Sequence, residues 1–238
     1  MTESLFRSDS YLAEAPAKVV FAEPRGIALD RTVFYPQGGG QAGDQGVLVI
    51  GGAEIPIVDT VYDADRRTIL HVPAAGADLP APGAGALARI DWARRLKRMR
   101  AHTALHLLSV VLPYPVTGGS VGDADGRLDF DSGEAALDKA DVERRLNALI
   151  AADAAVSQRW ITGEELAANP GLVKTMSVKP PTGAGRVRLI AIEGLDLQPC
   201  GGTHVARTGE IGYASVTSIE KKGKINRRVR IALADPPT

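Results

Sequence analysis

The chain has 238 residues, of which 45% are hydrophobic and 24% charged, with 26 Gly and 15 Pro. This length supports one or two domains with a substantial core, and the composition is that of a globular protein. Lys plus Arg and Asp plus Glu balance at 28 each, which excludes a strong net charge. Any binding of nucleic acid must therefore come from local basic patches.

The single cysteine, Cys200, excludes an intramolecular disulfide, so a reducing cytoplasm is the expected compartment. The first ten residues, MTESLFRSDS, lack a basic region followed by an apolar one, and we expect no secretory signal. The most apolar stretch, TALHLLSVVL (103–112), is too short to span a bilayer. These patterns predict a cytoplasmic protein without a membrane partner.

Residues 1–91 predict short strands that are separated by turns rich in Gly and Pro. The candidate strands are 17–23, 46–50, 55–61, 68–72 and 86–91. Residues 73–85 have the Ala, Gly and Pro content of a long surface loop. Strands at this spacing without intervening helical patterns predict a small β-barrel or a sandwich.

The pattern then changes to that of a helix of about 20 residues that begins near Asp91. Apolar residues recur three and four positions apart and predict one buried stripe, made of Trp92, Leu96, Met99, Leu107 and Val110. His102 and His106 fall beside this stripe. Five basic residues spread around the other side of the helix: Arg94, Arg95, Lys97, Arg98 and Arg100.

The remaining residues alternate between strand and helix patterns. Strands are predicted at 127–131, 156–162 and 186–192, and helices at 137–151 and 164–168. Asp131 or Ser132 is the predicted cap of the loop that leads into the longer helix. Residues 213–233 read as two strands around a Lys-Gly-Lys turn. The second half of the chain is therefore expected to be α+β.

Two residue pairs indicate a metal site: His102 with His106, and Cys200 with His204. Residues four apart on a helix share a face, so the first two imidazoles can reach one ion. The two glycines inside PCGGTH disfavour a helix, and a tight turn would fold Cys200 and His204 toward the same point. Each pair alone is more often two unrelated residues. Together, thiolate and imidazole ligands favour one zinc ion over magnesium or calcium.

The sequence leaves open whether this zinc is structural or catalytic. Four protein ligands close a tetrahedral site, whereas catalytic sites keep one position for water. A metalloprotease of the H-E-x-x-H type is excluded because Thr103 follows the first histidine. His71, in TILHV, has no partner in the sequence and is expected to be a structural histidine.

A Gly-rich segment, TVFYPQGGGQAGDQG (32–46), is the third feature. It can be a flexible turn. Alternatively, Gly38, Gly39 and Gly40 let backbone N–H groups approach a ligand, and Thr32 and Gln41 add side-chain hydrogen bonds. The segment lacks the Lys-Ser/Thr of a P-loop, so binding of a nucleoside triphosphate is not indicated.

Two basic runs are candidates for contact with nucleic acid: residues 94–100 and EKKGKINRRVR (220–230). A single run of this kind is usually a solvated surface. Two runs near the metal-binding motifs favour a partner with phosphates.

With these residues in view, the chain resembles the zinc-binding editing domain of alanyl-tRNA synthetase and its free-standing relatives, the AlaX proteins. The resemblance rests on HTALHLL (102–108) and QPCGGTHVARTGEIG (198–212). It extends to TVFYPQGGGQAGD (32–44), GRLDFD (126–131) and IEKKGKINRRVRI (219–231), and so covers nearly the whole chain.

The resemblance implies an α+β protein with a small N-terminal β-barrel domain at 1–91 and a zinc-binding editing domain at 92–238. It implies one zinc ion on His102, His106, Cys200 and His204. It also implies ATP-independent hydrolysis of the aminoacyl ester on tRNA(Ala) that has been mischarged with serine or glycine. Thr32 and Gln41 would lie at the catalytic site. The expected tRNA-binding residues are Gly38, Gly39, Gly40, Arg127, Asp129, Lys221, Lys222, Lys224, Arg227 and Arg228.

Two alternatives remain open at this point. A zinc-stabilised tRNA-binding module without hydrolytic activity would keep the ligands and basic runs without needing Thr32. A zinc esterase that acts on small molecules would not need the basic residues near the C-terminus.

Overall fold

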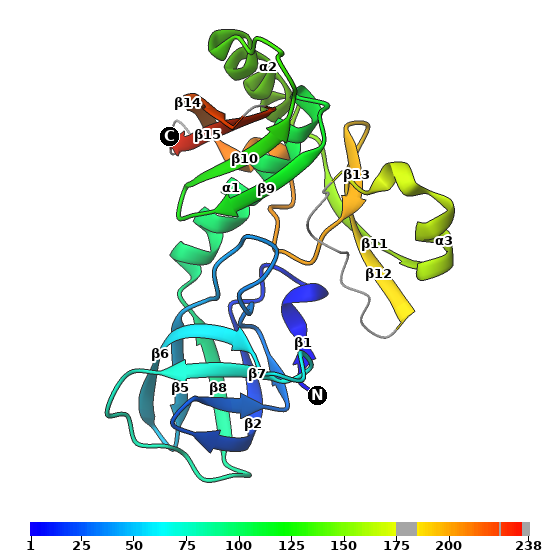
Figure 1. Cartoon of the computed structure of the whole chain (residues 1–238). Coiled ribbons are helices and arrows are strands. Elements are labelled where there is room, and N and C mark those ends of the chain that lie inside the picture. Colours follow the sequence, from blue (N-terminus) through cyan, green and yellow to red (C-terminus); the bar gives the residue numbers. More distant parts are fainter. Residues whose placement is uncertain (175–184, 224, 235–238) are drawn as a thin grey trace. The chain divides into compact units, whose positions relative to one another are not determined.

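The computed structural model describes residues 1–174, 185–223 and 225–234 (Figure 1). The chain divides into two compact units, Met1–Leu96 and Lys97–Thr238. The division falls inside helix α1 (Trp92–Val111), which starts in unit 1 and continues into unit 2. None of the helices among the described residues has both the length and the hydropathy for crossing a bilayer.

Unit 1 contains a closed β-barrel, with the strand order β2-β3-β7-β6-β5-β8. Its strands are β2 (Glu14–Glu23), β3 (Gly26–Leu29), β5 (Gly46–Ile50), β6 (Ala53–Tyr62), β7 (Ile69–Pro73) and β8 (Gly85–Ile90). Two short strands, β1 (Glu3–Ser4) and β4 (Arg31–Thr32), pair outside the barrel, and a 3-10 turn, η1 (Leu5–Arg7), follows β1. Aliphatic side chains such as Val19, Ile27 and Leu48 fill the core.

The barrel confirms the first of the two predicted architectures. The predicted strand 46–50 has the observed bounds, and the others agree within a few residues. Strand β3 was missed because all four of its residues, GIAL, are buried, so the sequence shows no alternation. The predicted loop 73–85 corresponds to the connection between β7 and β8.

The described residues of unit 2 form two sheets and three α-helices, the first of which is the part of α1 from Lys97 onward. One sheet has the order β14-β15-β10-β9, and the other has the order β11-β12-β13. The strands are β9 (Val116–Val121), β10 (Asp125–Asp131), β11 (Val156–Thr162), β12 (Arg186–Ile192), β13 (Asp196–Pro199), β14 (Tyr213–Lys222) and β15 (Asn226–Ala234). Besides α1, the described residues of this unit form the helical segments α2 (Lys139–Ala151), α3 (Gly163–Ala168), η2 (Pro170–Leu172) and η4 (Thr208–Ile211), the last two being 3-10 turns.

Most predicted elements of unit 2 are confirmed, with one correction at a helix start. Asp138 caps α2, since its side chain accepts a hydrogen bond from the Asp141 N–H, so the predicted cap at Asp131 or Ser132 is wrong. Strand β9 was missed because the pair Gly118-Gly119 lowers its strand propensity. The predicted turn between β14 and β15 contains Gly223 in the left-handed region, and Lys224 lies outside the described residues.

Helix α1 corrects the interpretation of the basic run 94–100. Arg95, Arg98 and Arg100 are only 0%, 4% and 6% exposed. Arg95 pairs with Asp44 within unit 1, whereas the Arg100 guanidinium donates to the carbonyl of Ile211 within unit 2. Buried guanidinium groups are tolerated because such partners compensate their desolvation. These three arginines form part of the interior, not a solvent-exposed basic face.

Candidate metal centre

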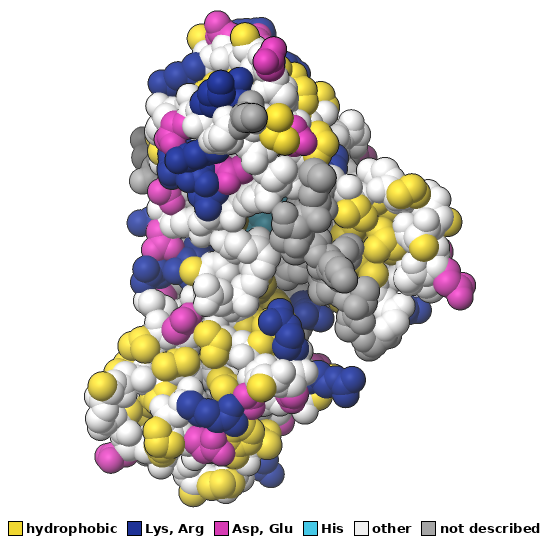
Figure 2. Space-filling model, viewed as in Figure 1, with side chains coloured by type: hydrophobic (Ala, Val, Ile, Leu, Met, Phe, Trp, Pro, Cys, Tyr) yellow, Lys and Arg dark blue, Asp and Glu magenta, His cyan; other side chains and the backbone are white. Residues whose placement is uncertain are grey.

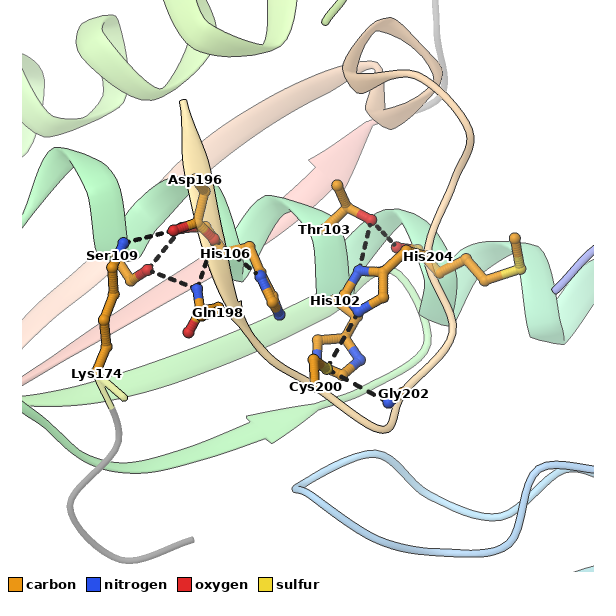
Figure 3. A network of polar contacts seen from close by, with 11 residues as sticks. His102, Thr103, His106, Ser109, Lys174, Asp196, Gln198, Cys200, Gly202 and His204 are labelled. Carbon is orange, nitrogen blue, oxygen red and sulfur yellow. Dashed lines mark hydrogen bonds and ion pairs between the residues drawn. The ribbon is translucent and has the colours of Figure 1, made fainter. Parts of the chain in front are cut away.

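Helix α1 and the loop after β13 bring four potential metal ligands together in unit 2 (Figure 3). His102 and His106 lie one turn apart on α1, and Cys200 and His204 come from the loop. Their ligand atoms all lie within 4.8 Å of one another. The predicted convergence of the two pairs is confirmed.

Two distances within this donor set match those of a zinc site. The Cys200 sulfur is 3.6 Å from His102 Nε2 and 3.3 Å from His204 Nε2. In a tetrahedral zinc site, the usual Zn–S and Zn–N lengths place neighbouring ligand atoms about 3.3–3.6 Å apart. Three imidazoles and one thiolate are also the donors that suit zinc chemically.

Arg188, a residue that the sequence analysis missed, shapes the loop that carries Cys200. Its buried guanidinium donates to the carbonyls of Cys200 (3.2 Å) and Gly202 (2.7 Å) and to Gln158 Oε1 (2.8 Å). The Gly202 N–H in turn points at the Cys200 sulfur, 3.3 Å away. The available signal was a lone arginine inside the apolar run VRLIAI of β12.

A carboxylate lies behind His106. Asp196 Oδ2 is 3.1 Å from His106 Nδ1 and 2.6 Å from the amide nitrogen of Gln198 (Figure 3). Asp196 Oδ1 accepts from Lys174 Nζ at 2.6 Å. The sequence contains a signal for these polar residues, since Asp196, Gln198 and Cys200 follow one another at intervals of two. In a strand, this spacing places side chains on one side.

Burial and charge give the ligands different proton affinities. Burial raises the pKa of the Cys200 thiol, but His102 and His204 together outweigh it and hold this pKa well below its usual value. Burial lowers the pKa of His106, yet Asp196 and Cys200 raise it overall to about 9. Burial lowers the pKa of His204 to about 3. Both shifts favour the form that has a lone pair for a metal, which is the thiolate for Cys200 and the neutral ring for His204.

Thr32 and His71 form a buried pair in unit 1. The Thr32 hydroxyl is 2.7 Å from His71 Nε2 and accepts from the Phe34 N–H at 3.0 Å. His71 Nδ1 is 2.9 Å from the Ile27 carbonyl. A carbonyl only accepts, and burial lowers the His71 pKa to about 4, so Nδ1 carries the ring proton and Nε2 accepts from Thr32. The proton of the Thr32 hydroxyl is thus used inside unit 1.

The Gly-rich segment forms a tight turn. Gly38 and Gln41 exchange two backbone hydrogen bonds, of 3.0 and 2.9 Å. Gly39 and Gly40 lie between them, are exposed, and have φ values of +56° and +84°, which favour glycine. The Gln41 side chain is buried. Consecutive glycines are therefore required by the backbone of the turn itself.

The predicted tRNA-binding residues of β10 and β15 form an ion-pair cluster on the sheet. Asp129 accepts from Arg228 through two hydrogen bonds, of 2.7 and 2.8 Å, and from Arg127 at 2.7 Å. Arg230, which belongs to the basic run 220–230 but not to the shorter list of expected tRNA-binding residues, lies opposite Arg127 and pairs with Glu220 at 3.1 Å. Figure 2 shows basic and acidic side chains interspersed over this part of unit 2.

Other predicted residues lie near the end of this sheet. Lys221 stands opposite Arg227 in the β14–β15 pairing, and Lys222 is 3.6 Å from Glu220. Lys224 lies outside the described residues.

Comparison with known proteins identifies the family. Residues 187–230 match the model of the threonyl and alanyl tRNA synthetase second additional domain, and residues 9–94 match the model of class II (A) tRNA synthetases. The chain is 33% identical to the alanyl-tRNA editing protein AlaX-M of Methanosarcina barkeri, over 99% of this chain and 100% of that protein. It belongs to the AlaX family.

Longer relatives contain the same region. The AlaX-L protein of Pyrococcus horikoshii is 32% identical over 94% of this chain and 56% of its own length. The alanine–tRNA ligase of Pyrobaculum neutrophilum is 32% identical over 92% of this chain and 25% of its own length. Within this AlaX chain, Cys200 and His204 fall in the additional-domain match, whereas His102 and His106 lie outside both matched segments.

Proposed function

We propose that the protein is a trans-editing hydrolase that removes serine, and also glycine, from mischarged tRNA(Ala). The observation that carries the proposal is the convergence of His102, His106, Cys200 and His204 in a chain of the AlaX family. Relatives that match over their full length are named alanyl-tRNA editing proteins.

We propose zinc as the ion held by these four residues. Bound zinc would supply a Lewis acid for ester hydrolysis by water. The Cys200 thiolate and the ring nitrogens would hold the ion at the end of the turn that Arg188 braces. Thr103, at the position of the glutamate in H-E-x-x-H, donates its proton to the Met99 carbonyl and so does not replace a general base.

Thr32 is the proposed reader of the serine hydroxyl. An apolar pocket that admits serine also admits alanine, so size cannot protect correctly charged tRNA. A group that hydrogen-bonds the hydroxyl can discriminate, because alanine would leave it unpaired. The Thr32 hydroxyl donates its hydrogen bond to His71, so it would act as the acceptor of a hydrogen bond from the substrate hydroxyl. The competing role of Thr32 is structural, since its hydroxyl already links Phe34 and His71.

The Gly-rich turn and the β10–β15 cluster are the proposed contacts with the rest of the substrate. Exposed Gly39 and Gly40 would present backbone N–H groups, and Gln41 would add a side-chain hydrogen bond. Arg127 and Arg228, oriented by Asp129, and the basic residues Lys221, Lys222, Lys224 and Arg227 would contact tRNA phosphates.

The decisive experiment follows ester loss from Ser-tRNA(Ala), Gly-tRNA(Ala) and Ala-tRNA(Ala) after incubation with the purified chain. Hydrolysis of the first two and sparing of the third is the expected result. Binding without hydrolysis would instead favour a zinc-stabilised tRNA-binding module, which the four-ligand, closed arrangement would suit. Hydrolysis of small esters alone would favour a general esterase.

A further inference from the structure

The Thr103 hydroxyl makes three hydrogen bonds, which use its proton and both of its lone pairs. Its oxygen is 2.9 Å from the Met99 carbonyl, 3.3 Å from the Val205 N–H and 3.1 Å from His204 Nδ1. The Met99 carbonyl only accepts, so the single hydroxyl proton goes to it. Both lone pairs of the hydroxyl are then left for donors.

These constraints assign the proton on His204. The Val205 N–H supplies one donor to Thr103, and His204 Nδ1–H supplies the other. With its proton on Nδ1, a neutral His204 keeps a lone pair on Nε2, the atom that faces the Cys200 sulfur at 3.3 Å. Thr103 itself is 0% exposed, so water does not substitute for these partners.

The second histidine of the helical pair shows the same arrangement with a different partner. His106 Nδ1 faces Asp196, which Gln198 and Lys174 hold in place. In both rings the outer nitrogen is directed to an oxygen acceptor, so the inner nitrogen is the one that can bind a metal, after loss of its proton in the case of His106.

We propose that Thr103 is a positioning residue that locks His204 in the Nδ1–H tautomer and so presets its Nε2 as a metal ligand. The residue next to the first histidine, which cannot serve as a base here, thereby acquires a function in metal binding. This inference rests on the metal site of the proposed function, but it concerns metal affinity and not the identity of the ester.

The test compares Thr103→Val with Thr103→Ser in the full chain. Valine keeps the shape and removes the acceptor, so zinc affinity, measured by competition with a chromogenic chelator, should fall about 10- to 100-fold. Serine keeps the hydroxyl and should retain affinity within about threefold of the wild type, because one oxygen still serves all three partners. Equal affinities of the valine and serine variants would overturn the proposal.

Thr208→Val is the matched control. Thr208 is also 0% exposed, lies in unit 2, and its hydroxyl bonds to the Ile150 carbonyl and the Ala154 N–H, away from the ligands. This variant should lose folding stability while keeping zinc affinity. If it lost affinity as Thr103→Val does, loss of a buried hydroxyl in general would explain the effect, and the proposal would be wrong.

A measurement without any substitution gives an independent test. Ring 15N chemical shifts of His204 in the metal-free wild-type chain should show a protonated Nδ1 and an unprotonated Nε2. A protonated Nε2 would overturn the proposal even if Thr103→Val did not fold. A wild-type chain that binds no zinc would refute the metal site of the proposed function, whereas a zinc-binding chain that is inactive on all esters would leave the role of Thr103 intact.

Discussion

At the scale of single residues, the Thr32 hydroxyl has two candidate roles, recognition of the serine substrate and stabilisation of the barrel unit. The Thr32 hydroxyl donates to His71 and accepts from Phe34, so one lone pair would remain for the substrate hydroxyl in the proposed contact. Thr32→Val should therefore cost about 1–3 kcal/mol in the transition state, or roughly 5- to 150-fold in kcat/KM for the seryl ester. Hydrolysis of the glycyl ester, which has no hydroxyl, should change much less.

Thr32→Ser is the control for this prediction because it retains the oxygen. It should keep most of the preference for the seryl ester over the alanyl ester. If Thr32→Val slowed hydrolysis of the seryl and the glycyl ester equally, Thr32 would be a structural residue of the barrel unit. Another residue would then have to recognise serine.

His71 predicts a pH dependence of folding in unit 1. Burial lowers its pKa from 6.5 to about 4, so the unfolded chain binds a proton that the folded chain excludes. The resulting stability is complete above pH 6.5 and declines as the pH falls toward 4, by about 3 kcal/mol in total. Urea unfolding of the wild type between pH 7 and pH 4 should show this decline.

The comparison for this prediction is His71→Gln, which removes the titrating ring. Its free energy of unfolding should be lower at pH 7 but depend less on pH over this interval. The same pH dependence in both proteins would assign the decline to other groups.

At the scale of elements, the sequence predicted those helices, strands and turns that depend on a local residue pattern. The helical period placed His102 and His106 on one face of α1, and the glycines of PCGGTH indicated the turn that brings Cys200 to them. Strand β3 could not be predicted from alternation because it is buried throughout. The burial of Arg95 depends on Asp44, a partner 51 residues away that no local pattern reveals.

The turn after β13 should depend on the forked shape of Arg188. Arg188→Lys keeps the positive charge. The single ammonium group of lysine cannot reach the two carbonyls and Gln158 together, as the planar guanidinium does. Loss of these buried hydrogen bonds should lower the free energy of unfolding by about 1–3 kcal/mol, measured on the zinc-loaded chain. Zinc dissociation should also become faster. An unchanged dissociation rate would show that the ligands alone hold the turn.

The β14–β15 hairpin should contribute to tRNA binding through its charge. Lys222→Ala should reduce the slope of log K against log salt by about 0.7–0.9 if the side chain neutralises one phosphate. Zinc content should stay constant, since Lys222 does not contact the ligands. Lys18→Ala, which removes an exposed lysine of β2 outside every predicted tRNA contact, provides the control. Equal slopes for Lys222→Ala and the wild type would indicate that this lysine is only part of a solvated surface.

At the scale of the whole molecule, the two units should respond differently to loss of metal. All four ligands belong to unit 2, where they join α1 to the loop after β13. Removal of the proposed zinc ion by a chelator should therefore accelerate amide hydrogen exchange in residues 98–111 and 196–204, because metal binding stabilises the folded state that holds the ligands. Strands of the barrel, such as β5 and β6, should keep their protection. Equal acceleration in the barrel would show that metal binding stabilises the chain as one cooperative unit.

The continuity of α1 also limits how the length of the chain can vary. Each residue inserted between Leu96 and His102 would rotate both imidazoles by about 100° around the helix axis and advance them by about 1.5 Å relative to the first turn. Seven inserted residues would restore the direction to within about 20°, at the cost of about 10 Å of extra helix. Insertions and deletions among relatives are therefore expected in the connection between β7 and β8, and not in residues 97–101, where Met99 accepts from Thr103 and Arg100 donates to Ile211 within unit 2.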